Sequence, residues 1–114
     1  MLTKGPAKKV TIFINEDSQH HMTALHDSIM TFLMHKGVSG ATATRAFSGF
    51  GSHQVLHNTS MEAMAEHLPV RIEFLESCEV VDAILPALCE LVSDGVVEVH
   101  PTTIVKAVSR TQPV

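Results

Sequence analysis

The chain contains no tryptophan and no tyrosine, and its five phenylalanines are the only aromatic residues besides histidine. Its eight lysines and arginines are dispersed, with no cluster larger than Lys8-Lys9, and the net charge is −4 with the histidines neutral. Domains that bind nucleic acids commonly carry a basic patch together with stacking aromatic side chains. We therefore expect no nucleic acid among the partners of this protein.

Long hydrophobic runs are also missing, although 45% of the 114 residues are hydrophobic. No apolar run approaches the roughly 20 residues that a membrane-spanning helix requires. The lysines near the N-terminus are not followed by the apolar stretch of a secretion signal. With 18% charged residues, the composition is that of a globular domain, and we expect a cytoplasmic protein that is not itself inserted in a membrane.

The two cysteines, Cys78 and Cys89, fall in one predicted helix, where they would lie about 16 Å apart along the axis. A disulfide needs Cα atoms within about 7 Å, so we expect two buried free thiols. Recognisable catalytic motifs are absent as well. The chain has no nucleophile elbow and no phosphate-binding P-loop, and we expect no enzymatic activity.

Hydrophobic periodicity predicts strands at 9–15, 41–48, 70–76 and 96–105, and helices at 22–37 and 78–94. Ser77 is placed to cap the second helix, and Pro86 is expected to kink or split it. The connection at 49–67 is unusually long for a compact domain, and long connections are often functional. Tails are expected at 1–8 and 107–114, which leaves one domain at 9–106.

Strand–helix–strand therefore occurs twice, which is typical of an α+β, ferredoxin-like βαββαβ fold. This fold has a four-stranded antiparallel sheet with two helices on one face. The alternation of residues places five side chains on the open face of the sheet: Thr11, Phe13, Arg71, Glu73 and Leu75. Such a half-apolar open face on a small domain predicts oligomerisation.

Two distinctive motifs flank the long connection. The stretch from Gly37 to Gly51, GVSGATATRAFSGFG, and the later HLPVRIEF resemble the two ends of the PII T-loop. From Lys9 to Lys106 the chain is still more similar to a PII-like family called domain of unknown function 190. That family has GED, GATxxRxxxGFG, DLPVxIE and a P-x-L helix, where this chain has NED, GATATRAFSGFG, HLPVRIE and LPALCEL.

The resemblance implies a homotrimer that binds an adenine nucleotide in clefts between subunits. It implies contacts to the nucleotide from Thr42, Gly49, Phe50, Gly51, Glu73 and Leu75. It also implies that a mobile loop at 51–67 touches and controls a membrane transporter, a channel or an enzyme, with an anion-linked role. Within that loop, the candidate contact residues are Ser52, Gln54, His57 and Asn58.

The sequence departs from the PII pattern in three ways, and two of them limit the number of phosphates that the ligand can carry. The segment Ser93-Asp94-Gly95-Val96 lacks the lysine that PII proteins place there to bind phosphates, and only Lys106 and Arg110 stand near the positions of their paired C-terminal arginines. Without tyrosine, the modification of a loop tyrosine found in many PII proteins is impossible. We expect AMP or ADP rather than ATP as the effector.

Arg45 has two interpretations. It could form an ion pair with Glu73 across strands or across a subunit interface, or it could contact an anion in the cleft. The sequence alone leaves both open.

Eight histidines prompt an alternative function. His53 and His57 are four residues apart, a spacing that would suit zinc on a helix. The alternative is a metal-binding trimer similar to the divalent-cation tolerance protein CutA, which shares the fold. A third possibility is a structural trimer with empty clefts.

Overall fold

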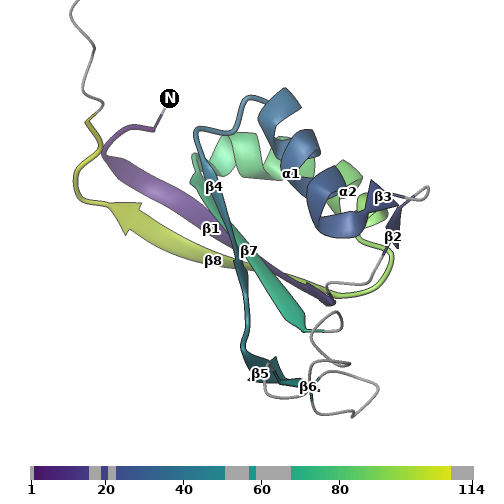
Figure 1. Cartoon of the computed structure of the whole chain (residues 1–114). Coiled ribbons are helices and arrows are strands. Elements are labelled where there is room, and N and C mark those ends of the chain that lie inside the picture. Colours follow the sequence, from purple (N-terminus) through teal and green to yellow (C-terminus); the bar gives the residue numbers. More distant parts are fainter. Residues whose placement is uncertain (1, 16–18, 21–22, 51–56, 59–67, 109–114) are drawn as a thin grey trace, which may run out of the picture.

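The computed structural model describes residues 2–15, 19–20, 23–50, 57–58 and 68–108. Its main sheet is antiparallel, with strand order β4-β7-β1-β8. These strands are β1 (Gly5–Asn15), β4 (Ala41–Arg45), β7 (Pro69–Glu76) and β8 (Val96–Ile104). The helices α1 (Leu25–His35) and α2 (Cys78–Leu91) cover one face of this sheet (Figure 1). The predicted ferredoxin-like βαββαβ fold is confirmed.

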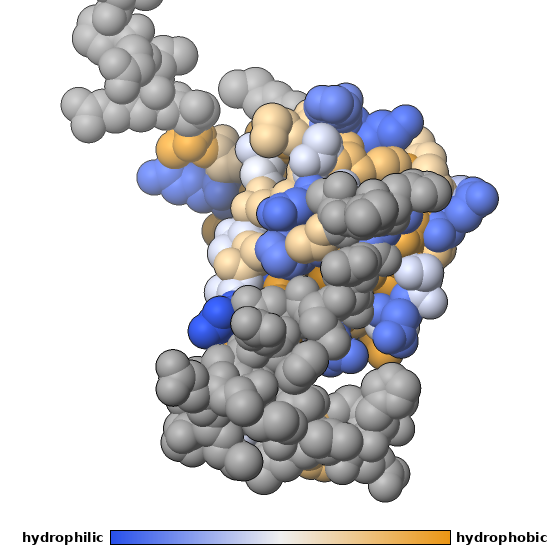
Figure 2. All heavy atoms as spheres, turned by 45° about the vertical axis from the view of Figure 1, so that its right-hand side comes forward, coloured by the Kyte–Doolittle hydropathy of each residue, from blue (hydrophilic) through white to orange (hydrophobic). Residues whose placement is uncertain are grey.

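The core lies between the sheet and the two helices, because alternate strand residues and one stripe of each helix are apolar. The buried set from the strands and helices is Val10, Ile12, Ile14, Leu25, Ile29, Leu33, Val70, Ile72, Phe74, Val81, Ile84 and Leu88. Full burial of such a side chain contributes roughly 1.5–3 kcal/mol. Figure 2 views the molecule with the helical side turned forward, and there hydrophilic and hydrophobic residues are interspersed over the coloured surface.

The first strand begins earlier than predicted, at Gly5 instead of Lys9. Residues 5–8, expected in a tail, pair with residues 101–104 of β8, and Ala7 is buried. Since β7 ends at Glu76, opposite Lys8, residues 5–7 have a partner strand on one side only. Pro6, which lacks an N–H, is tolerated at such a position.

Helix α2 begins where predicted. The Val80 N–H donates a hydrogen bond of 3.3 Å to the Ser77 hydroxyl, which confirms the predicted cap. Of the two alternatives expected at Pro86, a kink or a split, the split is wrong, because the helix continues through Pro86 to Leu91. Both cysteines are free, but Cys78 is half-buried and Cys89 is exposed, so the expectation of buried thiols is wrong.

The predicted strand at 41–48 is interrupted. After β4, the strand is interrupted at Ala46 and Phe47. The next two residues, Ser48–Gly49, form a short strand β5 that pairs with β6 (His57–Asn58). This pair lies at the lower end of the main sheet (Figure 1). A second short pair, β2 (Gln19–His20) with β3 (Thr23–Ala24), precedes α1, which begins three residues later than predicted.

A helix that crosses a membrane needs roughly 20 predominantly apolar residues. In the described part of the chain, neither α1 nor α2 is long and apolar enough to cross a membrane.

Candidate functional site

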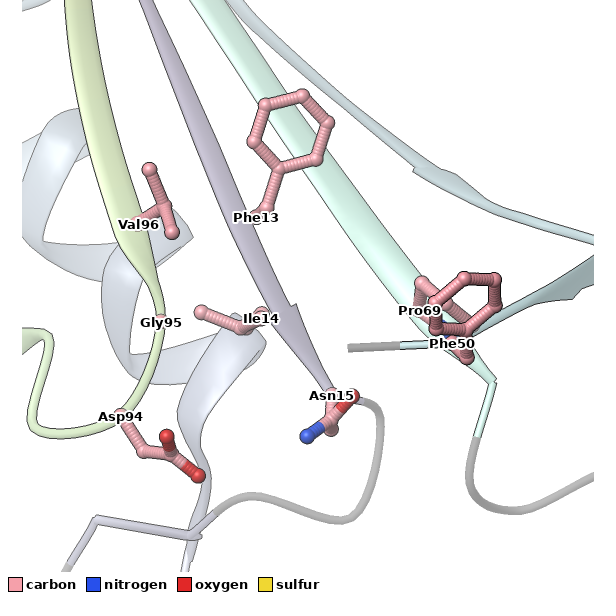
Figure 3. A pocket seen from close by; sticks show the side chains of 8 residues that line it. All are labelled: Phe13, Ile14, Asn15, Phe50, Pro69, Asp94, Gly95 and Val96. Atoms are coloured by element: carbon pink, nitrogen blue, oxygen red, sulfur yellow. The ribbon is translucent and has the colours of Figure 1, made fainter. Parts of the chain in front are cut away.

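One hollow lies where β1 ends and where β7 and β8 begin (Figure 3). We call it the Asp94 hollow. Its volume is about 380 Å³. The lining residues are Phe13, Ile14, Asn15, Phe50, Pro69, Asp94, Gly95 and Val96. Phe13, Phe50 and Pro69 supply apolar walls, while Asn15 and Asp94 lie together at one edge, with their polar groups turned toward each other (Figure 3).

Two glycines allow the close approach of segments around this hollow. Gly95 has φ +153°, and a Cβ there would lie 2.4 Å from the Phe13 carbonyl oxygen. A Cβ on Gly49 would lie 2.9 Å from Cγ of Pro69. Only glycine fits such a backbone without displacement of its neighbours. Gly49 therefore lets β5 lie against the start of β7, and Gly95 lets the turn before β8 lie against the end of β1.

The charge of the Asp94 hollow is negative. Among its described lining residues there is a carboxylate, an amide and no lysine or arginine. Such a site suits an uncharged group that carries hydrogen-bond donors, such as an amino group or a sugar hydroxyl, better than it suits a phosphate.

A second hollow, of about 640 Å³, lies at the other end of the sheet. We call it the Leu75 hollow. Its lining residues are Leu2, Ser39, Leu75, Ile104, Lys106, Ala107 and Val108. Leu75 is six residues along β7 from Pro69 of the first hollow, which corresponds to roughly 20 Å of extended strand. Its described lining residues are mainly apolar and include one cation, Lys106.

The open face of the main sheet extends from the Asp94 hollow to the Leu75 hollow, and charged side chains lie at its centre. Glu73 is 3.1 Å from the Lys9 ammonium and 3.7 Å from the Arg71 guanidinium, and the buried Thr11 hydroxyl donates to it at 3.2 Å. The hydrogen bond from Lys9, with that of Thr11 and the charge of Arg71, lowers the pKa of Glu73 despite some opposing desolvation. On the neighbouring strand, Glu98 pairs with His100 at 3.3 Å. The open face therefore has a charged centre, with Phe13 and Leu75 near its two ends.

The structure distributes the predicted nucleotide-binding residues over the whole sheet. Phe50 lines the Asp94 hollow, with Gly49 just before it, whereas Leu75 lines the hollow at the opposite end. Thr42 lies opposite Glu73 in the β4–β7 register and is exposed on the open face. Gly51 lies outside the described residues.

Arg45 is exposed at the end of β4, opposite Val70. The register places its side chain on the other face of the sheet from Thr42 and Glu73. Glu73 itself forms ion pairs with Lys9 and Arg71.

The remaining candidates fall in or near the loop. Ser52, His53 and Gln54 lie outside the described residues, and for His57 and Asn58 only the backbone of β6 is described. Within the described ranges, no group of three or more His, Cys, Asp or Glu side chains could hold a metal ion.

The sequence-based reasoning missed Phe13 and Asn15 as lining residues of the Asp94 hollow. Both belong to a strand that is easily recognised, but only the fold places the end of that strand beside Asp94 and Gly95. The turn at 93–96 did stand out in the sequence because it lacks a lysine.

Known proteins resemble the chain both in amino-acid sequence and in three-dimensional structure. A curated relative, UPF0166 protein MJ1524 of Methanocaldococcus jannaschii, is 28% identical over 89 residues, which are 78% of this chain and 82% of the relative. CPII, a nitrogen regulatory PII-like protein from Thiomonas intermedia K12 solved with ADP, AMP and bicarbonate, superposes with TM-score 0.66 at 23% identity, over 89% of this chain and 90% of that one.

A putative PII-like signalling protein of Thermus thermophilus, TTHA0516, gives TM-score 0.64 at 24% identity, over 88% of this chain and 90% of that one. These superpositions establish a common PII-like fold. The model of the DUF190 family, described as "Uncharacterized ACR, COG1993", matches residues 7–104. The chain therefore belongs to the domain of unknown function 190 family and has a PII-like fold.

Proposed function

We propose that this protein is a PII-like regulator that binds AMP or ADP in clefts between the subunits of a homotrimer. In this proposal, ligand binding controls a membrane transporter, a channel or an enzyme in the cytoplasm through the segment 51–67. The partner contacts would come from Ser52, Gln54, His57 and Asn58, and an anion transporter is the favoured partner class.

The observation that carries the proposal is the separation of the candidate ligand residues into two hollows. Phe50 belongs to one and Leu75 to the other, roughly 20 Å apart along β7. A ligand of nucleotide size cannot use both within one protomer. A head-to-tail cyclic assembly would bring the Asp94 hollow of one subunit against the Leu75 hollow of the next.

The composite cleft would then combine complementary parts. Gly49 and Phe50, with Gly51, would come from one subunit, while Thr42, Glu73 and Leu75 would come from its neighbour. The solved relative CPII, which was bound to ADP, AMP and bicarbonate, supports an adenine nucleotide as the ligand class.

The charges of the two hollows favour a ligand with few phosphates. Among the lining residues that the structure describes, the Asp94 hollow contributes a carboxylate and the Leu75 hollow contributes one ammonium group, that of Lys106. Anionic oxygens that lose water without gaining partners are costly. We therefore expect AMP or ADP to bind more tightly than ATP.

Isothermal titration calorimetry with AMP, ADP and ATP tests this proposal. Phe50→Ala should weaken AMP binding about fivefold, because an aromatic contact contributes roughly 1 kcal/mol. Met34→Ala is the matched control, since it also removes an exposed apolar side chain, but from helix α1. The proposal is wrong if no adenine nucleotide binds at millimolar concentration. ATP binding about tenfold tighter than AMP, a difference of about 1.4 kcal/mol, would contradict the argument from charge.

A further inference from the structure

Exposed apolar side chains gather at the two ends of the main sheet. At one end they line the Asp94 hollow, and they are Phe13, Phe50 and Val96. At the other end, Val105 and Val108 follow β8 and are 77% and 79% exposed. Apolar residues that gather on a surface commonly mark a site of interaction with a partner.

The same two ends carry opposite charges. The carboxylate of Asp94 lies at the edge of its hollow, and Lys106 lies in sequence between Val105 and Val108. Both charged residues are exposed, and neither takes part in an ion pair with another residue that the structure describes. One end thus offers apolar walls with an anion, and the other offers apolar side chains with a cation.

These complementary ends cannot meet within one protomer. Asp94 and Lys106 flank β8, whose nine extended residues span roughly 26 Å. In Figure 1, the turn before β8 and the segment after it accordingly lie at opposite ends of that strand. An ion pair requires its nitrogen and oxygen within about 4 Å of each other. A Lys106 ammonium that reaches Asp94 therefore belongs to a different copy of the chain.

We propose that the segment 105–108 of one subunit docks into the Asp94 hollow of the next subunit. In this contact Lys106 pairs with Asp94, and the valines of the segment bury apolar surface against Phe13 and Phe50. The hollow, of about 380 Å³, is thus completed by a second copy of the chain. The inference rests on the trimer of the proposed function, but it does not depend on the ligand.

The contact has the symmetry that a ring requires. It joins two different surfaces of identical chains, and such a heterologous contact closes into a ring when the rotation between subunits permits. Each subunit of a trimer then gives one segment and receives another. Because Lys106 also lines the Leu75 hollow, the pair lies at the proposed nucleotide cleft. A phosphate in that cleft competes with Asp94 for this ammonium, which agrees with the expected preference for few phosphates.

Carbodiimide coupling tests the ion pair directly, because it forms an amide bond only between a carboxylate and an amine that are in contact. The wild type should yield cross-linked dimers and trimers on a denaturing gel, and mass spectrometry should identify the peptide in which Asp94 is joined to Lys106. Asp94→Asn and Lys106→Gln should each abolish that peptide. The control Glu90→Gln, which removes an exposed carboxylate from α2, should retain it. A wild type that stays monomeric, or a trimer without this peptide, overturns the inference.

Charge exchange measures what the pair contributes to assembly. Asp94→Lys and Lys106→Asp should each raise the concentration at which trimers dissociate at least about fivefold, the effect of one unit charge about 4 Å away in water. The double variant restores the pair in reverse and should assemble as the wild type does. Glu90→Lys makes the same change of charge on the exposed side of α2 and should have no effect. Sedimentation over a dilution series gives these concentrations, and a double variant no better than the single ones contradicts the pair.

The same variants separate this inference from the proposed function. If Asp94 is cross-linked to Lys106 while calorimetry finds no binding of AMP, the proposed ligand is wrong and the inference stands. If AMP binds to a trimer whose assembly is unaffected by either charge reversal, the proposed function stands and the inference is wrong.

Discussion

At the scale of single residues, Gly95 has the strictest requirement. Its φ of +153° is unfavourable for residues with a side chain, and an added Cβ would lie 2.4 Å from the Phe13 carbonyl oxygen and 2.8 Å from Cγ2 of Ile14. We expect Gly95→Ala to destabilise the protein by about 2–3 kcal/mol, because both the backbone strain and the displacement of β1 oppose folding. Urea denaturation measures this change.

Gly40→Ala is the control for that substitution. No atom lies within 4 Å of a Cβ at Gly40, and its φ is outside the positive region. Replacement of glycine at such a position leaves stability unchanged or raises it by about 0.4–1 kcal/mol. Equal stability of the Gly95 and Gly40 variants would contradict the assigned role of Gly95.

For single residues, the sequence predicted on which face of the sheet a side chain lies. It did not predict which side chains would be its hydrogen-bond and ion-pair partners. Alternation correctly placed Arg71, Glu73 and Leu75 on one face of β7. The pairing of Glu73 with Lys9 and Thr11 depends on the β1–β7 register. This register brings Thr11 and Glu73 together across 62 positions of the chain and has no local signature. The same holds for Gly95, whose place after a helix was evident while its contact with Phe13 was not.

At the scale of elements, Glu76 connects three of them. This buried carboxylate at the end of β7 accepts a hydrogen bond of 2.7 Å from the Ser39 N–H, in the connection between α1 and β4, and one of 3.3 Å from the Ser77 N–H at the start of α2. Burial raises the pKa of Glu76, but the N–H donors of Ser39 and Ser77 outweigh it, and the net pKa is lowered. The ionised form is therefore the stabilising one.

We expect Glu76→Gln to lower the free energy of unfolding by about 1–2 kcal/mol at neutral pH, since a neutral amide accepts these hydrogen bonds less strongly. Because the folded pKa is below the unfolded one, the difference between wild type and variant is present above pH of about 4.3 and disappears as the pH falls through the folded pKa. Denaturation from pH 3 to 7 checks this. Glu90→Gln, on the exposed side of α2, is expected to show no such dependence, and a pH-independent effect of Glu76→Gln would contradict the role of its charge.

Element types were predictable because the apolar periods of the strands and helices are strong, while element ends were decided by pairing. Residues 5–8 contain Gly5 and Pro6, which argue locally against a strand, yet they pair with β8. Pro86 argued for a kinked or divided helix. The helix α2 is nevertheless undivided, since packing of Val81, Ile84 and Leu88 spans the proline and supports both turns. The short β5–β6 pair joins polar residues across the loop and had no hydrophobic pattern to reveal it.

At the scale of the whole molecule, the arrangement of hollows and charges favours assembly through the open face. Glu73 already has Lys9, Arg71 and Thr11 as partners within one protomer, so another subunit can cover this face without leaving that carboxylate unpaired. The family resemblance supplied the expectation of a composite site. The sequence alone could not divide the candidate residues between subunits, because the proposed division rests on their distance along β7.

The composite cleft makes a prediction that a site within one protomer does not. Phe50→Ala and Leu75→Ala should each weaken AMP binding, while light scattering gives three times 12.4 kDa for both, as for the wild type. When the two variants are unfolded together and refolded as mixed trimers, some clefts receive Phe50 from one subunit and Leu75 from its neighbour. Random assortment restores about one quarter of the clefts to wild-type affinity, whereas each variant refolded alone restores none. Calorimetry on the mixture measures this fraction, and a mixture that binds no better than its components would place the ligand within a single subunit and contradict the trimeric cleft.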